Sequence, residues 1–419
     1  MHASILRRSL LSTAILLSLT AVPSFATNGL APIGLGMEHR SLGGAGTGYA
    51  ANTSSIASNP AATSFVADGY DVGLEIFQPK RSASFNGKAF GMPADVNYDG
   101  NGKQNFFIPE GSYKRSLNQF DFGVAVYGNG GMNTSYKQNP NFGVGKAGVD
   151  YQQLFVAPTL SYPLNDQHAI GISANLVYHK FKAEGLQNFD NAQFSANPGH
   201  VTNNGYDSST GIGVSFGWQG KFAPSLSLGV AYRSKVSMGK LDQYSGLFAN
   251  AGEFDVPAAL SAGFAWQAAP NTLIVGDVQR INYTDLAAIG NSSHKPVQFG
   301  GKDGPGFGWK DVTAFKLGLK QQLTPQMAIM VGYNKGTNPV RSSDTTLNVL
   351  APGVSDQHFT LGAEWQLTPK SSLIASFVHS FENETKGDTT VPPPGPVPLD
   401  AYNLKMKQNS LGVAYSHQF

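Results

Sequence analysis

The chain has 419 residues, of which 13% are charged, with 49 glycines, no cysteine and a formal net charge of +2. The charged fraction is about half of the roughly 25% found in soluble domains, so the composition argues against a set of ordinary soluble domains. The lack of cysteine excludes disulfides and thiolate–metal chemistry, and the near-neutral charge gives no reason to expect a nucleic-acid partner.

Residues 1–26 have the pattern of a secretory signal peptide. Arg7 and Arg8 form a positive start, residues 10–22 are apolar, and residues 24–26 (Ser-Phe-Ala) fit the small-x-small cleavage rule. The apolar run is shorter than the roughly 20 residues that a spanning helix needs. We therefore predict cleavage before Thr27 rather than an uncleaved anchor.

Residues 27–66 are rich in Gly, Ala, Ser and Asn and almost free of large apolar side chains. Such a segment cannot bury enough apolar surface to fold alone, so we predict an N-terminal plug, or hatch, inside a larger structure. Asn59, Pro60 and Ala61 mark a rigid turn, and Gly43 and Gly44 allow close backbone packing. These five residues are the predicted gating residues; a phosphate loop is disfavoured because its flanking strand and helix are missing.

From residue 67 to 419 the apolar residues recur at every second position, which is typical of strands. One run has Phe359, Leu361 and Trp365 on one face and Thr360 and Gly362 on the other. Many runs suit the roughly 9–11 residues that a tilted strand needs to cross a bilayer. Because the second face carries Gly, Ser, Ala and Asn rather than Lys and Glu, we expect it to face a crowded interior and the apolar face to meet lipid.

The connections alternate in length along the chain. Short ones are centred on residues 117–118, 165–166, 223–224, 269–270, 324–325 and 368–369, and long ones cover roughly 87–102, 128–148, 184–207, 238–252, 286–307, 337–353 and 384–402. This asymmetry predicts an all-β fold: a transmembrane barrel of about fourteen antiparallel strands in the Gram-negative outer membrane, with the short turns and both termini periplasmic. Lipopolysaccharide and other outer-membrane lipids would surround it.

The last strand ends on an aromatic residue, Phe419, at the chain terminus. This resembles the C-terminal signal by which outer-membrane barrels are recognised, so we expect the barrel assembly machinery as a partner. The other interpretation is an ordinary strand that ends in Phe.

Several motifs together resemble one family of outer-membrane proteins. They are Gly34, Gly36, Gly43 and Gly44, the run Ser54–Ala61, Phe107-Ile108-Pro109, Val256-Pro257-Ala258, Trp309-Lys310-Asp311-Val312 and Gly332-Tyr333-Asn334. The sequence is similar in these motifs to the FadL-type transporters (OMPP1/FadL/TodX), which take up long-chain fatty acids or aromatic hydrocarbons. The resemblance implies a barrel with an N-terminal hatch and lateral exit of the ligand through a gap in the wall beside a kinked strand.

The candidate ligand contacts are two lysines and one apolar loop tip. Lys316 and Lys320 lie on one strand face, where a ligand carboxylate could meet them, and Leu247 and Phe248 lie at the tip of a long loop. The alternative for the lysines is that the interior charges neutralise each other or hold the plug; these charges are Glu75, Asp277, Lys316, Lys320 and Glu364.

The sequence therefore predicts a monomeric transporter of hydrophobic compounds, with long-chain fatty acids as the first choice and passive diffusion as the mechanism. Aromatic or alkane hydrocarbons, a lipase-like enzyme barrel and a water-filled porin remain as alternatives. The sequence has no zinc-ligand spacing and no Gly-x-Ser-x-Gly elbow, so no catalytic residue, metal or cofactor is expected.

Overall fold

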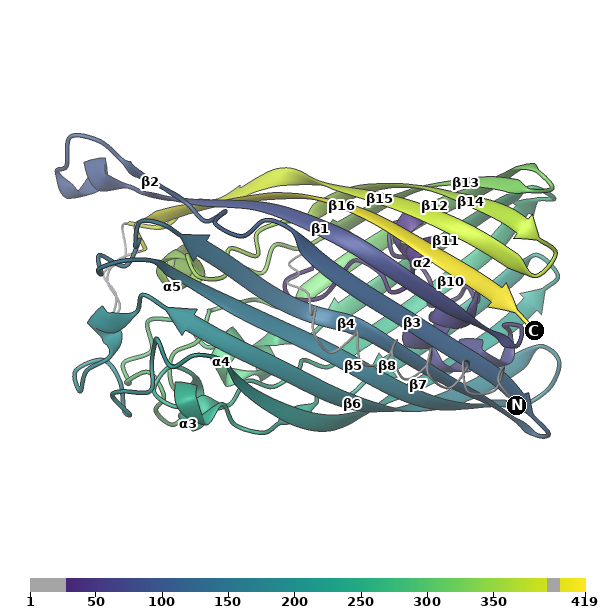
Figure 1. Cartoon of the computed structure of the whole chain (residues 1–419), viewed down its shortest axis with the longest axis horizontal. Coiled ribbons are helices and arrows are strands. Elements are labelled where there is room, and N and C mark those ends of the chain that lie inside the picture. The colour runs from purple at the N-terminus through teal and green to yellow at the C-terminus, as the bar shows by residue number, and fades with distance from the viewer. Residues whose placement is uncertain (1–27, 390–399) are drawn as a thin grey trace, which may run out of the picture.

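The structure is a computed structural model that describes residues 28–389 and 400–419, and these form one closed cylinder of antiparallel strands (Figure 1). The predicted signal peptide lies outside the described residues. Within them, no helix is long and apolar enough to cross a membrane.

Fourteen long strands make the wall, each paired with its neighbour in the chain. They are β1 (Gly69–Phe85), β3 (Phe106–Leu117), β4 (Phe120–Tyr136), β5 (Ala147–Pro163), β6 (His168–Glu184), β7 (Asp207–Ala223), β8 (Leu226–Arg233), β10 (Ala259–Ala269), β11 (Thr272–Ile281), β12 (Val312–Thr324), β13 (Met327–Gly336), β14 (Gln357–Thr368), β15 (Ser371–Thr385) and β16 (Tyr402–Gln418). Two short strands, β2 (Val96–Asp99) and β9 (Ser237–Met238), pair with β1 and β7.

Closure comes from the first and last strands, which pair over their whole length from Gly69 with Gln418 to Phe85 with Tyr402. An open edge in hydrocarbon would leave unpaired backbone groups, each costing several kcal/mol. The prediction of a closed, fourteen-stranded antiparallel barrel is therefore confirmed.

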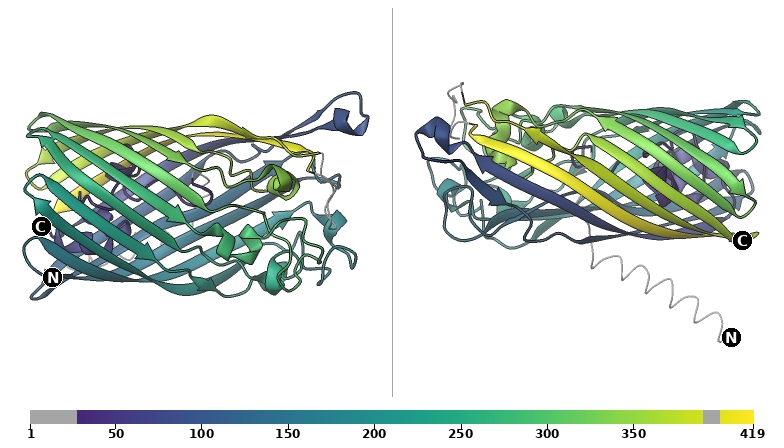
Figure 2. Two further views of the ribbon diagram at one scale, coloured as in Figure 1. Left: turned by 180° about the vertical axis from the view of Figure 1, so that it is seen from behind. Right: turned by 90° about the horizontal axis from the view of Figure 1, so that it is seen from above.

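The two ends of the barrel differ, as the connection lengths predict. The end that holds the C-terminus has only short turns (the short-turn end), and the opposite end carries the long connections (the long-loop end; Figures 1 and 2). The prediction that residues 128–148 are a loop is wrong in its first half, because β4 continues to Tyr136. The glycines of this stretch form a bulge in β4, where the register with β5 shifts between Gly128 and Gly130.

Residues 28–66, which we call the N-terminal segment, lie inside the barrel near the short-turn end (Figure 1). The segment has three single turns of helix, α2 (Met37–Ser41), η1 (Thr53–Ala57) and η2 (Pro60–Ser64). Glycines of the wall strands make room for this segment. A Cβ added at Gly332 would clash with the amide nitrogen of Gly43, and one added at Gly171 would clash with the carbonyl carbon of Pro60. The small-residue face of the strands is therefore the surface against which this segment packs.

The long connections fold together into a second filling at the long-loop end, which we call the loop cap. The short helical turn η3 (Gly87–Phe90) lies at the tip of the β1–β2 connection, which projects beyond the rim of the barrel (Figure 1). The short helical turns of the loop cap are η4 (Gln187–Phe189), η5 (Asp242–Tyr244), α3 (Ala249–Gly252), η6 (Tyr283–Asp285), α4 (Ala287–Gly290), η7 (Ser342–Asp344) and α5 (Thr345–Asn348). The loop cap has an apolar core in which Trp309, Tyr244 and Phe254 are fully buried.

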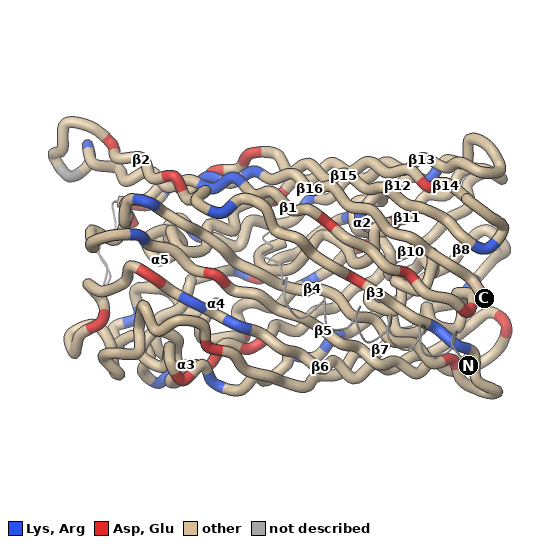
Figure 3. Tube along the Cα trace, in the orientation of Figure 1, with Lys and Arg blue, Asp and Glu red and all other residues tan. Residues whose placement is uncertain are grey.

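Charged residues are sparse along the middle of the wall that Figure 3 shows and more frequent toward the long-loop end. The side chains that point out from the middle of the strands are apolar and exposed, such as Leu361 and Phe377. This is the pattern of a wall that faces lipid.

Candidate functional site

A cavity lies in the lumen between the N-terminal segment and the wall. It encloses about 750 Å³, counting its open mouths. Its apolar lining includes Ile33, Leu35 and Ile56 of the segment and Tyr127 of β4. Its polar lining on the wall strands includes Asn129, Asn175, Arg233, Ser261, Asp277, Gln279 and Lys316.

Two cations face this cavity without a carboxylate partner. The Lys316 ammonium donates to Gln279 Oε1 at 3.1 Å, and Arg233 Nη1 donates to Asn129 Oδ1 at 2.6 Å. Neither side chain takes part in an ion pair among the described residues, and the buried Arg233 Nε has no hydrogen-bond partner there. A buried charge without a counter-charge is costly, so this part of the cavity lining favours an anion.

Asp277, the one carboxylate that lines the cavity, is bound to the N-terminal segment. Its Oδ2 accepts from the amides of Gly46 (2.9 Å) and Thr47 (3.0 Å) and from the Thr47 hydroxyl (2.8 Å). Asp277 lies opposite Lys316 in the β11–β12 ladder, but the two are not within ion-pair distance. The carboxylate therefore holds the segment and leaves the lysine available.

The structure places the two predicted lysines in different surroundings. Lys316 lines the cavity, but the Lys320 ammonium lies 2.6 Å from Glu38 Oε1 and 2.6 Å from Glu364 Oε2. Glu38 belongs to α2, so Lys320 ties the N-terminal segment to the wall, which was the alternative interpretation of these charges. We therefore carry only Lys316 forward as a ligand contact.

A second buried ion cluster fixes the same helix to another part of the wall, at β1 and β3. Arg40 Nη1 lies 3.2 Å from Glu75 Oε2 and 3.0 Å from Glu110 Oε2, and all three side chains are at least nine-tenths buried. Glu75 also accepts from Ser410. The α2 helix is thus held by charged contacts to β1, β3 and β12.

Of the predicted gating residues, Asn59, Ala61 and Gly43 are hydrogen-bonded to the wall. Asn59 Nδ2 donates to the carbonyls of Thr47 (2.8 Å) and Trp218 (3.1 Å), and Asn59 Oδ1 caps the next turn by accepting from Ala61 N at 3.0 Å. Pro60 is the first residue of that turn. Gly43 and Gly44 have φ values of 69° and 86°, which L side chains rarely adopt. The contacts explain the turn, and a role of these residues in gating stays a prediction.

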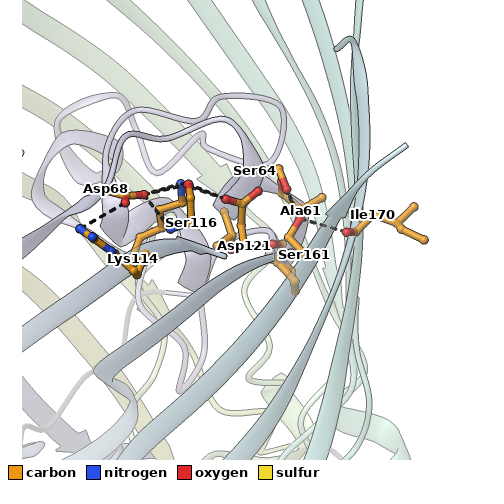
Figure 4. Close-up of polar contacts among 11 residues, drawn as sticks. Ala61, Ser64, Asp68, Lys114, Ser116, Asp121, Ser161 and Ile170 are labelled. Carbon is orange, nitrogen blue, oxygen red and sulfur yellow. Dashed lines mark hydrogen bonds and ion pairs between the residues drawn. The ribbon is translucent and has the colours of Figure 1, made fainter. Parts of the chain in front are cut away.

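Figure 4 shows how the end of the N-terminal segment joins the wall near the short-turn end. Ser64 donates to Ser161 Oγ on β5 at 2.8 Å, and Ser161 donates to the Ile170 carbonyl on β6 at 3.0 Å. Next to it, Lys114 lies 2.8 Å from Asp68 and 3.0 Å from Asp121. The end of the segment is thereby joined to β5 through Ser64, and the adjoining Asp68 is joined to β3 through Lys114.

The wall has one interruption next to the cavity. β3 pairs with β1 from Phe106 to Lys114, but it pairs with β4 only from Gly111 onward. Further toward the long-loop end, the edge of β4 that faces β3 has a backbone partner again, because Gly102 N donates to the Ser135 carbonyl at 2.9 Å. Residues 106–110 of β3 and 127–134 of β4 thus face each other without backbone pairing, and we call this place the wall break.

A second cavity, of about 360 Å³, lies behind the wall break. Its lining includes Glu110, Gly111 and Val126, at the end of the break where the pairing of β3 with β4 begins. It also includes Leu35, Ala57 and Tyr127, which line the first cavity as well. The two cavities are therefore separated only by side chains of the N-terminal segment and of β4.

Leu247 and Phe248 lie inside the loop cap and are almost completely buried, rather than exposed at a loop tip. They line a small apolar cleft of about 290 Å³ together with Phe181, Phe307, Leu350 and five other residues. The cleft contains no charged side chain, so it suits an apolar group.

One Ser–His pair on adjacent strands bears on the enzyme alternative. Ser209 Oγ and His179 Nε2 are 2.7 Å apart, and the other ring nitrogen is 3.3 Å from the Tyr151 hydroxyl. Tyr151 accepts from Gln153 Nε2 at 2.7 Å. A Ser–His–Asp triad has a carboxylate on the second ring nitrogen of the histidine, whereas His179 has the neutral Tyr151 hydroxyl at that place.

Sequence reasoning missed Arg233, Asn129, Arg40 and Glu110. Arg233 ends an alternating run and could have been found from its interior phase, two residues after Ala231. Asn129 was hidden in a glycine run that suggested a loop. Within the described residues, no group of three or more His, Asp or Glu side chains could hold a metal ion.

Comparisons with known proteins agree with this architecture. The sequence profile of a family described as "Outer membrane protein transport protein (OMPP1/FadL/TodX)" matches residues 23–419. No curated protein sequence matches the chain.

Among solved structures, the chain is similar to a Pseudomonas aeruginosa FadL homologue, with a TM-score of 0.68, 16% identity and coverage of 96% of this chain and 100% of that one. It is also similar to the P. putida toluene transporter TodX, with a TM-score of 0.67, 17% identity and coverage of 92% of this chain and 99% of that one. A third similar structure is the Ralstonia pickettii toluene transporter TbuX, with a TM-score of 0.63, 16% identity and the same two coverages. At these identities the likeness concerns the fold alone.

Proposed function

Because this chain belongs to the OMPP1/FadL/TodX family of outer-membrane transport proteins, we propose that its own cargo is a hydrophobic compound with a carboxylate group, of the fatty-acid class. Members of this family transport hydrophobic compounds and are channels rather than enzymes. The observation that carries the proposal is the pair of cations, Arg233 and Lys316, that face one cavity without a carboxylate to neutralise them.

The cavity supports a definite orientation of such a cargo. The carboxylate fits between the Arg233 guanidinium and the Lys316 ammonium, where charge-assisted hydrogen bonds are available. The hydrocarbon part then lies toward Ile33, Leu35 and Tyr127, in the apolar lining of the cavity.

The rest of the route follows from the neighbouring features. The cargo enters from the long-loop end by way of the apolar cleft at Leu247 and Phe248, crosses to the lumen cavity, and leaves through the wall break into the bilayer. The shared lining of the two cavities at Leu35, Ala57 and Tyr127 supports this last step. In this proposal the short-turn end is periplasmic, and movement is passive diffusion down a gradient.

The N-terminal segment acts as the hatch of this route. Its residues Leu35 and Ala57 stand between the lumen cavity and the cavity at the wall break, so a shift of α2 and η1 opens the way. The buried ion clusters at Arg40 and Lys320 hold the closed arrangement.

The test compares dodecanoate with dodecanol, which has the same chain but no charge, on the detergent-purified protein by native mass spectrometry and competition binding. We expect Arg233→Gln and Lys316→Gln each to weaken dodecanoate binding by roughly ten- to a hundredfold, the value of one hydrogen bond to a charged group. The affinity of both variants for dodecanol should stay within about twofold of that of the unsubstituted protein. Lys295→Gln, a control in the loop cap, should change the affinity for neither ligand by more than about twofold.

A neutral aromatic or alkane hydrocarbon is the second candidate, favoured by the uncharged cleft in the loop cap. If the two substitutions left dodecanoate binding unchanged and toluene bound as tightly as dodecanoate, the carboxylate proposal would be overturned in favour of the neutral cargo.

A further inference from the structure

A chain of buried hydrogen bonds runs from the cation site to the loop cap. Arg233 Nη1 donates to Asn129 Oδ1 (2.6 Å), and Asn129 Nδ2 donates to Gln153 Oε1 (3.1 Å). Gln153 Nε2 then donates to the Tyr151 hydroxyl (2.7 Å), which meets His179 Nδ1 (3.3 Å). Each donor in this chain fixes the orientation of the next group, so the Asn129 amide has its oxygen toward Arg233.

Asn129 also lies at the edge of the wall break. It belongs to the bulge of β4, and its neighbours Gly128, Gly130 and Gly131 have no side chains. On the β3 side this stretch has no backbone partner. Within this stretch, Asn129 is the residue whose side-chain hydrogen bonds reach the cation site, whereas Asn133 contacts Arg81 and Thr134 contacts the Leu350 carbonyl.

We propose that Asn129 is a positioning residue that couples occupation of the cation site to the wall break. The proposal rests on the carboxylate cargo proposed above. In the empty site Arg233 holds Asn129 and thereby the edge of the break. A carboxylate that binds Lys316 and the guanidinium draws the guanidinium away from Asn129, so that the Asn129 side chain loses one of its two hydrogen bonds just when the cargo is present.

This coupling has a reciprocal consequence. If the ligand loosens the contact between Arg233 and Asn129, then a loosened contact must favour the ligand by the same factor. Removing the Asn129 side chain should therefore tighten dodecanoate binding. A residue that merely orients Arg233 for the ligand would give the opposite sign.

The experiment measures dodecanoate affinity and the hydrogen exchange of residues 127–133 on the full-length protein in detergent. In the unsubstituted protein we expect dodecanoate, but not dodecanol, to speed exchange in this stretch. Asn129→Ala should raise the affinity by about two- to tenfold, the factor that one hydrogen bond supplies, and should make exchange fast with or without dodecanoate. Asn129→Asp, which forms an ion pair with Arg233, should lower the affinity and abolish the response to dodecanoate.

Asn133→Ala is the matched control, because Asn133 is on the same strand and accepts from Arg81 Nη1 (3.3 Å), which does not line the lumen cavity. It should leave the affinity and the ligand response unchanged. Weaker binding by Asn129→Ala, or dodecanoate binding with no change in exchange at residues 127–133, would overturn the coupling while the proposed cargo stands. No dodecanoate binding to the unsubstituted protein would overturn both.

Discussion

The N-terminal segment and the loop cap both fill the barrel, but different forces hold them in place. The segment is fixed to the wall by ions and directed hydrogen bonds, at Arg40, Lys320, Asp277 and Asn59. The loop cap packs around an apolar core in which Trp309, Tyr244 and Phe254 are fully buried.

This difference fits the two tasks that we propose for the regions. Directed polar contacts are lost stepwise when a segment shifts, so they suit a segment that gates between a held and a released arrangement. Apolar packing is non-directional, so the cap can admit hydrophobic compounds of varied shape. The comparison leads to three predictions, taken from the largest expected effect to the smallest.

The largest effect is expected at the Arg40 cluster. Arg40→Ala leaves the Glu75 and Glu110 carboxylates buried without a cation, which should cost about 3–5 kcal/mol of the docking free energy of the N-terminal segment. Hydrogen exchange of residues 37–58 should speed up accordingly, while exchange in the loop cap should stay as it was. Ionic conductance in planar bilayers should rise.

Two variants control this prediction. Arg280→Ala breaks an ion pair in which the arginine is 56% exposed, so it should have almost no effect. Adding Glu110→Gln to Arg40→Ala removes one of the two stranded charges and should recover part of the docking. Unchanged exchange in Arg40→Ala would show that the ion cluster does not hold the segment.

Trp309 tests the apolar side of the comparison. Its ring packs edge-on against the Tyr283 ring, with the two ring centroids 5.3 Å apart. Its Nε1 donates to Asn348 Oδ1 at 2.6 Å. Trp309→Ala should destabilise the cap by about 3 kcal/mol, seen as faster proteolysis of the long loops. Trp309→Phe keeps most of the packing and should cost only about 1 kcal/mol. If the alanine variant released the N-terminal segment as well, the two fillings would not be independent.

The smallest effect concerns a polar contact within the loop cap, the ion pair between His294 and Asp400. The hydrogen bond to Asp400 raises the pKa of His294 above its ordinary value of 6.5. A raised pKa in the folded state means that the pair stabilises the cap fully below pH 6.5 and loses this contribution as pH rises through the folded value.

The expected loss is about 1 kcal/mol or less, since solvent screens a partly exposed pair. Proteolysis of the long loops should therefore become slightly faster between pH 6 and pH 8.5. His294→Gln should remove this pH dependence; a variant that kept it would place the titrating group elsewhere.

Much of the fold was predictable because it depends on local patterns. The alternation in Phe359–Leu367 shows both faces of β14, and the short connections at residues 117–118 and 223–224 lie at strand ends as predicted. The error in β4 has a local cause, since the glycines at 128, 130 and 131 favour a loop and a bulge equally. Only pairing with β5 makes this stretch a strand.

The candidate site was less predictable, because its contacts join distant parts of the chain. Lys316 and Lys320 are equivalent in sequence phase, yet Lys320 meets Glu38, which is 282 residues away, and Lys316 faces an open cavity. Leu247 and Phe248 form an apolar loop tip in the sequence, and the other long loops cover them. Nothing in the sequence indicated the Arg40 cluster, because its partners Glu75 and Glu110 lie on strands that are distant from Arg40 in the chain.

The sequence by itself determined the barrel, its strand number and the polarity of its two faces, because a period of two and alternating turn lengths are written in neighbouring residues. The tertiary structure decided which interior charges are paired and which remain available, where the wall loses its pairing, and which glycines receive the N-terminal segment. These depend on the register of strands around a closed cylinder and on the position of a segment with no strong preference of its own, so no stretch of sequence contains them.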